Sequence, residues 1–405
     1  MFHTLLIHQG FVSPKEAGGT RHYEFARYIT KRGNKFTVVA STRNYLSGKM
    51  TTAQVEGDLD GIMVLRAHTP SAHHKSFVWR VYGFLVFMLS SLWKALRVPS
   101  LDIIMGTSPP IFQAGSALVI AKLKRKPFLL EVRDLWPEFA IDMGVLKSVF
   151  LIKISRWFEN FLYRNADHLL VNSPAYKTYL IEYGVPEHKV SFIPNGVDPE
   201  MFNTQGDASR YRKIWGIEEK FAVVYAGALG PANDIPTILQ AAAKIQDTSN
   251  VFFVFVGDGK ERTRSEALTA TLNLKNVKFV GGLPKSEMAD VLAAADVTIA
   301  TLQNIPMFTT TYPNKVFDYL AAGKPIIFNI DGVIREVVEK ADAGLFVPPG
   351  DSDALAKAIL TLEHKQGELT EMGQRGKQYV AKNFNRNDHA KAFLALLNKL
   401  AQRRT

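Results

Sequence analysis

Short apolar runs alternate with longer amphipathic stretches along almost the whole of this chain. The runs are rich in β-branched and aliphatic residues, which is typical of strands that a parallel sheet buries on both faces. In the first half, the predicted strands are Thr4–His8, Phe36–Ala40, Leu101–Met105, Phe128–Val132, His168–Val171 and Val190–Ile193. In the second half, they are Ala222–Tyr225, Val251–Val256, Val277–Phe279, Val297–Ala300, Pro325–Phe328 and Gly344–Val347.

Helical patterns separate these runs. In the first half they cover Thr20–Arg32, Phe77–Leu96, Gln113–Lys124, Lys147–Tyr163 and Pro174–Glu182. In the second half they cover Asp234–Ile245, Glu261–Ala270, Lys285–Ala295, Asn314–Ala322 and Asp351–Leu362. Alternating strands and helices predict an α/β fold of two doubly wound, Rossmann-like domains. One stretch departs from this pattern, because Thr51–Glu56 and Ile62–Arg66 read as a hairpin joined by GDLDG.

The predicted domain boundary lies in residues 193–207, IPNGVDPEMFNTQGD, which are rich in Pro, Gly, Asn and Asp. We therefore expect an N-terminal domain over residues 1–199 and a C-terminal domain over 200–385. The chain reads as helical after Leu362, and we expect residues 386–405 to pack back on the first domain. Open parallel sheets bind ligands at the carboxyl ends of their strands, so two facing sheets would place the site in a central cleft.

Composition narrows the class of protein. The chain has 405 residues, of which 47% are hydrophobic and 21% charged, and it contains no cysteine. These values are ordinary for a globular protein, and they exclude disulfide scaffolds, thiol nucleophiles and iron–sulfur clusters. The net charge is +11, and residues 1–199 carry most of it, with 24 Lys and Arg against 15 Asp and Glu. A basic half favours a phosphorylated substrate, an anionic membrane surface or nucleic acid as partner.

The most apolar stretch runs from Val81 to Trp93, with basic residues on both sides. It is too short to span a bilayer, which needs about 20 residues. Two interpretations stay open: a buried amphipathic helix, or a helix that lies in a membrane interface with basic ends. The chain begins without the basic and apolar regions of a signal peptide.

Four segments carry candidate chemistry. Gly18 and Gly19 precede Thr20, a suitable N-cap, so a bulky anion could approach the amides at the start of the next helix. In the segment 310–325, TTYPNKVFDYLAAGKP, Lys315 and Asp318 project from one helical face. The lysine can hold a phosphate oxygen and the carboxylate can accept two ribose hydroxyls.

The other two segments also follow predicted strands. AGALGPAND, residues 226–234, and VGDGKER, residues 256–262, each place a glycine loop before a helix. Neither fits a dinucleotide fingerprint, and the chain has no P-loop. EVRDLWPE, residues 131–138, places Arg133 and Asp134 beside an aromatic residue at the end of a strand. Two D-x-D sequences, at Asp58 and Asp351, read as turn and cap residues, so we expect no metal site.

Taken together, four sequences resemble the family 4 glycosyltransferases of the GT-B fold. They are IHQGFVSPKEAGGTRHYEFARYITKRGNKFTVV, IPNGVD, the GDG after a strand, and YPNKVFDYLAAGKP. The resemblance covers nearly the whole chain and is closest to bacterial O-antigen and capsule enzymes of the N-acetylfucosamine transferase type. It implies retaining transfer from a nucleotide sugar, with UDP favoured over GDP, and neither a metal nor another cofactor.

The resemblance also implies roles for residues. Asp318 matches the second glutamate of the family's E-x7-E motif, which binds ribose, whereas Thr310 stands in place of the first. Ala228 and Asn233 stand where many members have an Arg and Lys phosphate clamp, so Lys315 and Arg262 or Arg264 would have to neutralise the diphosphate. The full set expected at the donor comprises Gly18, Gly19, Gly227, Asn233, Gly257, Asp258, Arg262, Gly282, Thr310, Asn314, Lys315 and Asp318.

On the acceptor side, Arg133 stands where many members have a histidine, and with Asp134 it would orient the sugar or acceptor. The implied acceptor is a saccharide on a polyisoprenyl diphosphate, at the cytoplasmic face of the inner membrane. Trp79, Arg80, Phe84 and Phe87 would contact an anionic membrane surface. Two alternatives stay open: a sugar-nucleotide 2-epimerase of the same fold, and a non-enzymatic module that binds anionic membranes or nucleic acid. No nucleic-acid motif is present, and we expect no nucleic-acid partner.

Overall fold

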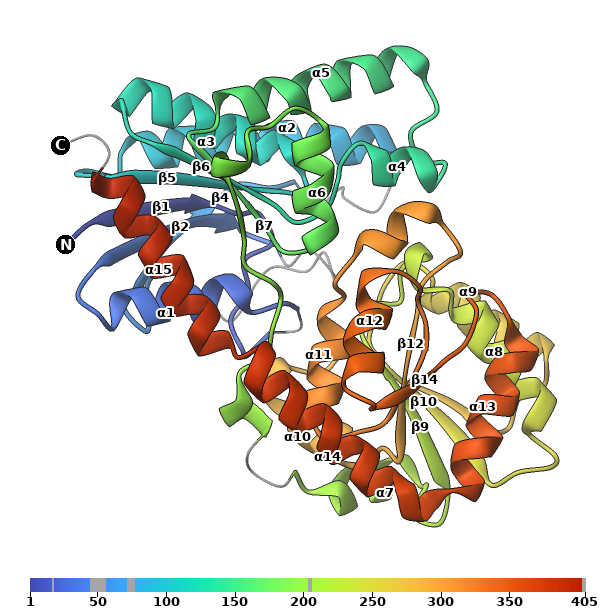
Figure 1. Ribbon diagram of the computed structural model, residues 1–405. Helices are drawn as coiled ribbons and strands as arrows, with labels where there is room; N and C mark the ends of the chain where they lie inside the picture. Colours follow the sequence, from blue (N-terminus) through green and yellow to red (C-terminus); the bar gives the residue numbers. More distant parts are fainter. Residues whose placement is uncertain (17, 44–55, 71–76, 203–205, 403–405) are drawn as a thin grey trace. The chain divides into compact units, whose positions relative to one another are not determined.

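The computed structural model describes residues 1–16, 18–43, 56–70, 77–202 and 206–402 (Figure 1). The chain forms two compact units. The first unit comprises residues 1–13, 19–194 and 387–405, and the second comprises 14–18 and 195–386. The crossing after residue 194 lies within the predicted boundary segment, residues 193–207, and five residues before the predicted end of the first domain at residue 199. Arg21 accounts for its position, because its guanidinium donates hydrogen bonds to the carbonyl oxygens of Ile193 and Pro194 and so holds the chain to the first unit up to that point.

An eight-stranded sheet forms the centre of the first unit, in the order β3-β4-β2-β1-β5-β6-β7-β8. Its strands are β1 His3–Ile7, β2 Lys35–Ser41, β3 Gly57–Leu59, β4 Ile62–Ala67, β5 Ile103–Ser108, β6 Phe128–Val132, β7 His168–Val171 and β8 Val190–Phe192. Its helices are α1 Arg21–Thr30, α2 Phe77–Leu96, α3 Ile111–Lys124, α4 Glu138–Asp142, α5 Val149–Asn165, α6 Pro174–Glu182 and α15 Arg386–Gln402, with a 3-10 turn η1 at Glu187–Lys189. All the pairings are parallel except that of β3 with β4.

The second unit contains a six-stranded parallel sheet in the order β11-β10-β9-β12-β13-β14. Its strands are β9 Phe221–Ala226, β10 Val251–Val256, β11 Val277–Gly281, β12 Val297–Thr301, β13 Ile326–Asn329 and β14 Gly344–Phe346. Its helices are α7 Ala208–Trp215, α8 Ile235–Ile245, α9 Arg262–Thr271, α10 Met288–Ala293, α11 Asn314–Ala321, α12 Val333–Lys340, α13 Ser352–His364 and α14 Gln366–Asn383. Short 3-10 turns occur at η2 Pro199–Phe202, η3 Pro231–Asn233, η4 Lys285–Glu287 and η5 Pro306–Thr310. The predicted α/β class with two doubly wound sheets is confirmed.

The helix α15 lies far along the sequence from the core that it completes. Its residues Ala390, Phe393, Leu397 and Leu400 are buried in the core cluster of the first unit. The Phe393 ring stacks on Phe25 of α1 with 5.1 Å between centroids. The first unit therefore needs residues from both ends of the chain.

The predicted hairpin differs in its turn. Residues 51–55 lie outside the described part, and β3 begins at Gly57, so most of GDLDG is strand. The turn consists of Asp60 and Gly61, with φ of 52° and 85°. Two successive positive φ angles make a tight two-residue turn that fits the twist of the strands, so the pairing extends to Leu59. Three other departures are the helices α4, α7 and α12, which the hydrophobic pattern did not predict.

The helix α2 has the predicted bounds, and its two sides differ. Trp79 is 47% exposed, whereas Phe87 is 1% exposed and packs inside the unit. Phe84 is half-buried and stacks on Phe112 of α3. Of the predicted membrane residues, Phe87 therefore does not face outward, and the side chain of Arg80 lies outside what the structure describes. None of the described helices combines the length and the hydropathy that crossing a bilayer requires.

Candidate active site

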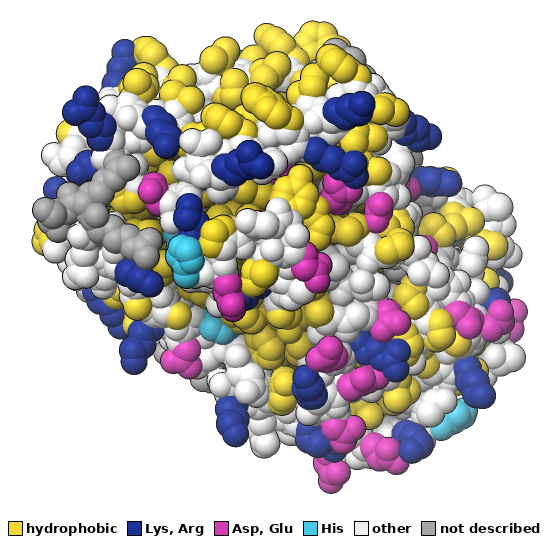
Figure 2. Space-filling model, turned by 45° about the horizontal axis from the view of Figure 1, so that its top comes forward, with side chains coloured by type: hydrophobic (Ala, Val, Ile, Leu, Met, Phe, Trp, Pro, Cys, Tyr) yellow, Lys and Arg dark blue, Asp and Glu magenta, His cyan; other side chains and the backbone are white. Residues whose placement is uncertain are grey.

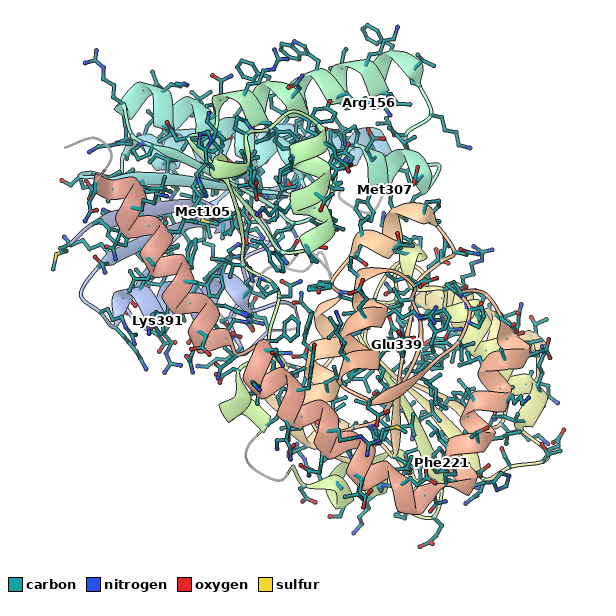
Figure 3. All side chains as sticks on the ribbon, in the orientation of Figure 1. Met105, Arg156, Phe221, Met307, Glu339 and Lys391 are labelled. Carbon is teal, nitrogen blue, oxygen red and sulfur yellow. The ribbon has the colours of Figure 1, made fainter. Side chains whose placement is uncertain are left out.

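The second sheet changes direction between β9 and β12, because the strand order runs from β9 toward β11 on one side and toward β14 on the other. Such a switch point opens a crevice at the carboxyl ends of the strands. Figure 3 labels Phe221 at the start of β9 and Met307 in η5, at the opposite, carboxyl edge of this sheet. Most of the predicted donor residues follow strands at this edge.

Lys315 lies at the switch point. It is the second residue of α11, and its Nζ donates to the Tyr225 hydroxyl at 2.7 Å and to Asn233 Oδ1 at 2.6 Å. The same Nζ is 4.4 Å from the centroid of the Tyr225 ring. Among the described residues, no carboxylate forms an ion pair with Lys315, and burial lowers its pKa to about 7. A partly buried lysine with neutral partners at a helix N-terminus is suited to receive an anion.

The resemblance predicts that Lys315 compensates for the missing lysine at position 233, and Lys315 and Asn233 are in contact. Asn233, which replaces it, accepts a hydrogen bond from Lys315, so the cation comes from α11 to the same place. Tyr225 was not predicted as a site residue, because it lies within an apolar strand. Its hydroxyl donates to the Ala228 carbonyl oxygen at 2.7 Å and thereby ties the loop after β9 to the lysine.

The loops after β9 and β10 are in close contact through glycines. A Cβ on Gly257 would lie 1.8 Å from the Gly227 carbonyl oxygen, and a Cβ on Gly259 would lie 2.3 Å from that of Leu229. A Cβ on Gly227 would lie 3.2 Å from Lys315 Cε. These glycines keep the backbone close to the lysine, so a ligand phosphate can approach the amides.

Asp318 lies one turn after Lys315 on α11. Its carboxylate forms an ion pair with Lys285 of η4, and both side chains are mostly buried. Lys285 was missed because it is 33 residues away in sequence. Thr310, the other residue of the motif, donates its hydroxyl to the Met307 carbonyl oxygen within η5. Asp318 is thus the one carboxylate of the predicted ribose-binding motif, and Lys285 orients it.

The remaining predicted donor residues border the same edge. Arg262, the first residue of α9, pairs with Glu266 at 2.9 Å and lies 3.8 Å from Asp258. Gly282 follows β11 in an exposed position. Asn314 begins α11, and its buried Oδ1 has no hydrogen-bond partner among the described residues. An unpaired buried oxygen at this point is a candidate to accept a hydrogen bond from a ligand.

The predicted glycine pair falls at a division of the chain. Gly18, with a φ of 143°, belongs to the second unit, and Gly19 begins the next segment of the first. Ser286 of η4 donates its backbone N–H to the Pro14 carbonyl oxygen at 3.2 Å, which ties this loop to the segment that carries Lys285. Thr20 precedes α1 as predicted, although its hydroxyl bonds to Glu24 instead of capping a backbone amide.

In the first unit, Arg133 and Asp134 follow β6 at the carboxyl edge of the sheet. The Arg133 backbone N–H donates to the Ser108 carbonyl oxygen, which follows from the pairing of β5 with β6, and its Nε is buried without a partner. Burial raises the pKa of Asp134 to about 6, although Arg133 acts in the opposite direction. The two residues are thus a poorly solvated acid and a guanidinium with unused hydrogen-bonding capacity.

A buried polar cluster beside Arg133 was not predicted. Glu131 of β6 accepts hydrogen bonds from Arg21 Nε at 3.0 Å and from His22 Nε2, and the His22 ring lies edge-on to His8, with 4.4 Å between centroids. Burial opposes ionisation of Glu131, but His22 and Arg21 outweigh it and hold its pKa well below the usual range. Burial also lowers the pKa of both histidines. The sequence signal for this cluster was Glu131, a charged residue within the apolar strand FLLEV.

The described residues contain no group of three or more His, Asp or Glu that could hold a metal ion. The side chains of Asp58 and Asp351 accept hydrogen bonds from the backbone amides of Gly61 and Ala354, as turn and cap residues do. The second unit thus offers an anion a lysine and backbone amides, and the first unit, taken by itself, offers a polar group an arginine and an acid.

Two doubly wound domains with glycine loops at the switch point of the second sheet form the architecture of the GT-B glycosyltransferases. The family models agree with this assignment. Residues 17–196 match the glycosyl transferase 4-like domain, and residues 207–379 match glycosyl transferases group 1. The chain therefore belongs to the family 4 glycosyltransferases.

Similar proteins support the family and the fold. The probable glycosyltransferase WbjE of Pseudomonas aeruginosa is 26% identical over 304 residues, 74% of each chain. The putative colanic acid biosynthesis glycosyl transferase WcaI of Escherichia coli is 23% identical over 249 residues, covering 60% of this chain and 59% of WcaI. The solved structure of Anabaena Alr3699/HepE in complex with UDP-glucose has a TM-score of 0.76 at 18% identity, covering 98% of this chain and 100% of that one.

Proposed function

We infer that this enzyme transfers a sugar, expected to be a deoxyamino sugar, from a UDP-sugar to a lipid-linked saccharide in the synthesis of a bacterial surface polysaccharide, with retention of configuration. The observation that carries the donor part is Lys315, a partly buried lysine with neutral partners beside glycine loops. The name of WcaI supports a polysaccharide product, and the UDP-glucose complex of HepE supports a UDP-linked donor.

The proposed reaction forms a bond between the acceptor hydroxyl oxygen and the anomeric carbon. The bond from that carbon to the diphosphate breaks, UDP leaves, and the hydroxyl proton passes to a phosphate oxygen of UDP. The largest developing charge is on the departing diphosphate, so catalysis is mostly electrostatic and positional. Lys315 and the amides of the loops after β9 and β10 stabilise that charge without a metal ion.

Asp318 and Asn314 bind the nucleoside part of the donor in this proposal. Asp318 accepts the ribose hydroxyls, while its ion pair with Lys285 orients the carboxylate. On the first unit, Arg133 and Asp134 orient the acceptor or the transferred sugar. The unpaired Arg133 Nε donates a hydrogen bond to one of its oxygens, and the Asp134 carboxylate accepts one from a hydroxyl.

The acceptor implies a location. A saccharide on a polyisoprenyl diphosphate lies at the membrane surface, so we propose peripheral association with the cytoplasmic face of the inner membrane. The outward residue Trp79 and the basic balance of residues 1–199 support this location.

A thermal-shift series with UDP, GDP and ADP tests the donor assignment. We expect UDP to stabilise the protein selectively, since ligand at about 100 times its Kd adds about 2.7 kcal/mol. The Asp318→Ala variant should lose the shift, whereas Asp353→Ala, which removes an exposed carboxylate of the same unit, should keep it. Equal shifts for all three nucleotides would contradict the assignment.

Product analysis then separates transfer from the alternative reaction. UDP-sugars are incubated with and without lipid-linked acceptors. Release of UDP that depends on an acceptor supports the transferase. Appearance of a C2 epimer with no acceptor present would identify a sugar-nucleotide 2-epimerase and overturn the proposal.

A further inference from the structure

Exposed large hydrophobic side chains concentrate on three helices of the first unit. On α2 they are Trp79, Tyr82, Leu85, Leu89, Trp93 and Leu96; on α3 they are Val119 and Leu123; and on α5 they are Val149, Phe150, Leu151, Ile154, Trp157 and Phe161. We call this set the three-helix face. Figure 1 shows the three helices covering one side of the first sheet, and Figure 2 brings this broad hydrophobic area forward at the top.

Helical spacing makes this face continuous along α2 and α5. The exposed residues of α2 follow one another at intervals of three or four, and the sequence Phe150, Ile154, Trp157, Phe161 forms one stripe along α5. The opposite sides of the helices pack inward. Phe112 of α3 stacks on Phe84 of α2 and on Phe158 of α5, so the three helices form one packed layer.

The helix α5 presents the most exposed part of the face. Phe150 is 70% exposed and Trp157 is 65% exposed. The inner side of α5 is fixed by Glu159, which is buried and accepts a hydrogen bond from Tyr163 at 2.6 Å. Two large aromatic side chains are therefore held in water by a firmly packed helix. Monomeric proteins seldom expose apolar patches of more than a few hundred Å² without a partner.

The charge on these helices identifies the partner. The helices α2, α3 and α5 together carry seven Lys and Arg, and their one acidic residue is Glu159. Burial raises the pKa of Glu159 to about 8, so it adds little negative charge at neutral pH. Lys122, Lys153 and Arg164 are exposed and form no ion pair among the described residues. Figure 2 shows Lys and Arg side chains around the hydrophobic area.

We propose that the three-helix face is a docking surface for an anionic lipid bilayer, with α5 as its main contact. Aromatic side chains favour the interface between headgroups and acyl chains, and basic side chains at the rim are attracted to anionic lipids. A second copy of this chain would bring two sets of these lysines and arginines together, which opposes self-association. The inference deepens the proposed membrane association, and it assigns the main contact to α5 in place of α2 alone.

Vesicle co-sedimentation of the full chain tests the proposal. Vesicles of phosphatidylcholine with about 30% phosphatidylglycerol are compared with vesicles of phosphatidylcholine alone. We expect binding to the anionic vesicles. The double variant Phe150→Ser and Trp157→Ser should reduce that binding by at least about tenfold, and so should Lys153→Glu with Arg164→Glu. The control Met63→Ser with Ile214→Ser removes two exposed hydrophobic residues elsewhere and should bind normally.

Three outcomes would overturn the proposal. Unchanged binding by both sets of α5 variants would place the contact elsewhere. Equal binding to neutral vesicles would exclude recognition of lipid charge. Absence of vesicle binding, together with a dimer in sedimentation velocity that the Phe150 and Trp157 variants dissociate, would make the face an interface between copies. UDP binding by the same variants is measured in solution, so a failure of membrane docking is distinguished from a failure of the donor assignment.

Discussion

At the scale of single residues, the proposed donor site depends on a lysine whose pKa is lowered by burial. Lys315 donates to a hydroxyl and an amide oxygen, and burial lowers its pKa to about 7. An arriving diphosphate favours the charged form, so binding should take up a proton. In the proposed mechanism, the free enzyme holds an incomplete electrostatic site that the donor completes.

This coupling predicts a pH dependence for UDP binding. Above pH 7 the lysine of the free enzyme loses its proton, whereas the complex with UDP contains the protonated lysine. The affinity for UDP should therefore fall by about tenfold between about pH 7 and about pH 8.5. Calorimetry in buffers of different ionisation enthalpy measures the proton uptake. The Lys315→Met variant should bind UDP about ten- to a hundredfold more weakly. It should show no such dependence on pH.

The matched control is Lys340→Met, which removes an exposed lysine paired with Glu336. It should retain both the affinity and the pH dependence. A wild-type affinity that does not change over this range would mean that Lys315 is not linked to the ligand.

Sequence reasoning predicted Lys315 and Asp318 as site residues but not the residues that position them. Lys315 and Asp318 share one helical turn, so their spacing was visible in the sequence. Lys285 and Tyr225 reach them from 33 and 90 residues away, across η4 and β9. Such distant partners depend on the packing of the sheet, which hydrophobic periodicity does not describe. The same reason applies to the cluster around Glu131.

At the scale of elements, strands were easier to predict than short helices. Each predicted strand of the second sheet lies at an observed strand, since a buried parallel strand is a compact apolar run. The helices α7 and α12, of eight residues each, were missed because they follow loop-like Gly and Asp residues. Of the membrane residues predicted on α2, Trp79 is exposed and Phe87 is buried. The sequence did not separate them, because a helix that is apolar around most of its surface does not reveal which side faces the sheet.

The helix α15 gives a prediction about stability. Phe393 is 1% exposed and stacks on Phe25. The Phe393→Ala variant should lower the free energy of unfolding of the first unit by about 3–5 kcal/mol, through lost burial and the cavity that remains. Chemical denaturation measures this change. Lys391→Ala, an exposed residue on the same helix, should change it by less than about 0.5 kcal/mol. Equal effects would show that α15 does not complete that core.

At the scale of the whole molecule, charge and hydrophobic surface belong to the same half of the chain. Residues 1–199 carry a balance of +9, from 24 basic and 15 acidic residues, and the three-helix face lies within them. We expect binding to anionic vesicles to weaken several-fold as NaCl rises from about 0.1 M to about 0.5 M, because salt screens exposed charges. Co-sedimentation across a salt series measures this effect. Binding that is insensitive to salt would leave the hydrophobic contact as the sole attraction.

The docking of α15 also bears on how the protein is made. The second unit, apart from residues 14–18, is one continuous segment, 195–386, whereas the core of the first unit includes residues 390–400. Domains fold as their residues leave the ribosome, so the second unit can finish folding while the first still lacks a helix. During that interval the surface around Phe25 is uncovered. A chaperone that recognises apolar surface should therefore engage the nascent first unit until α15 has been synthesised.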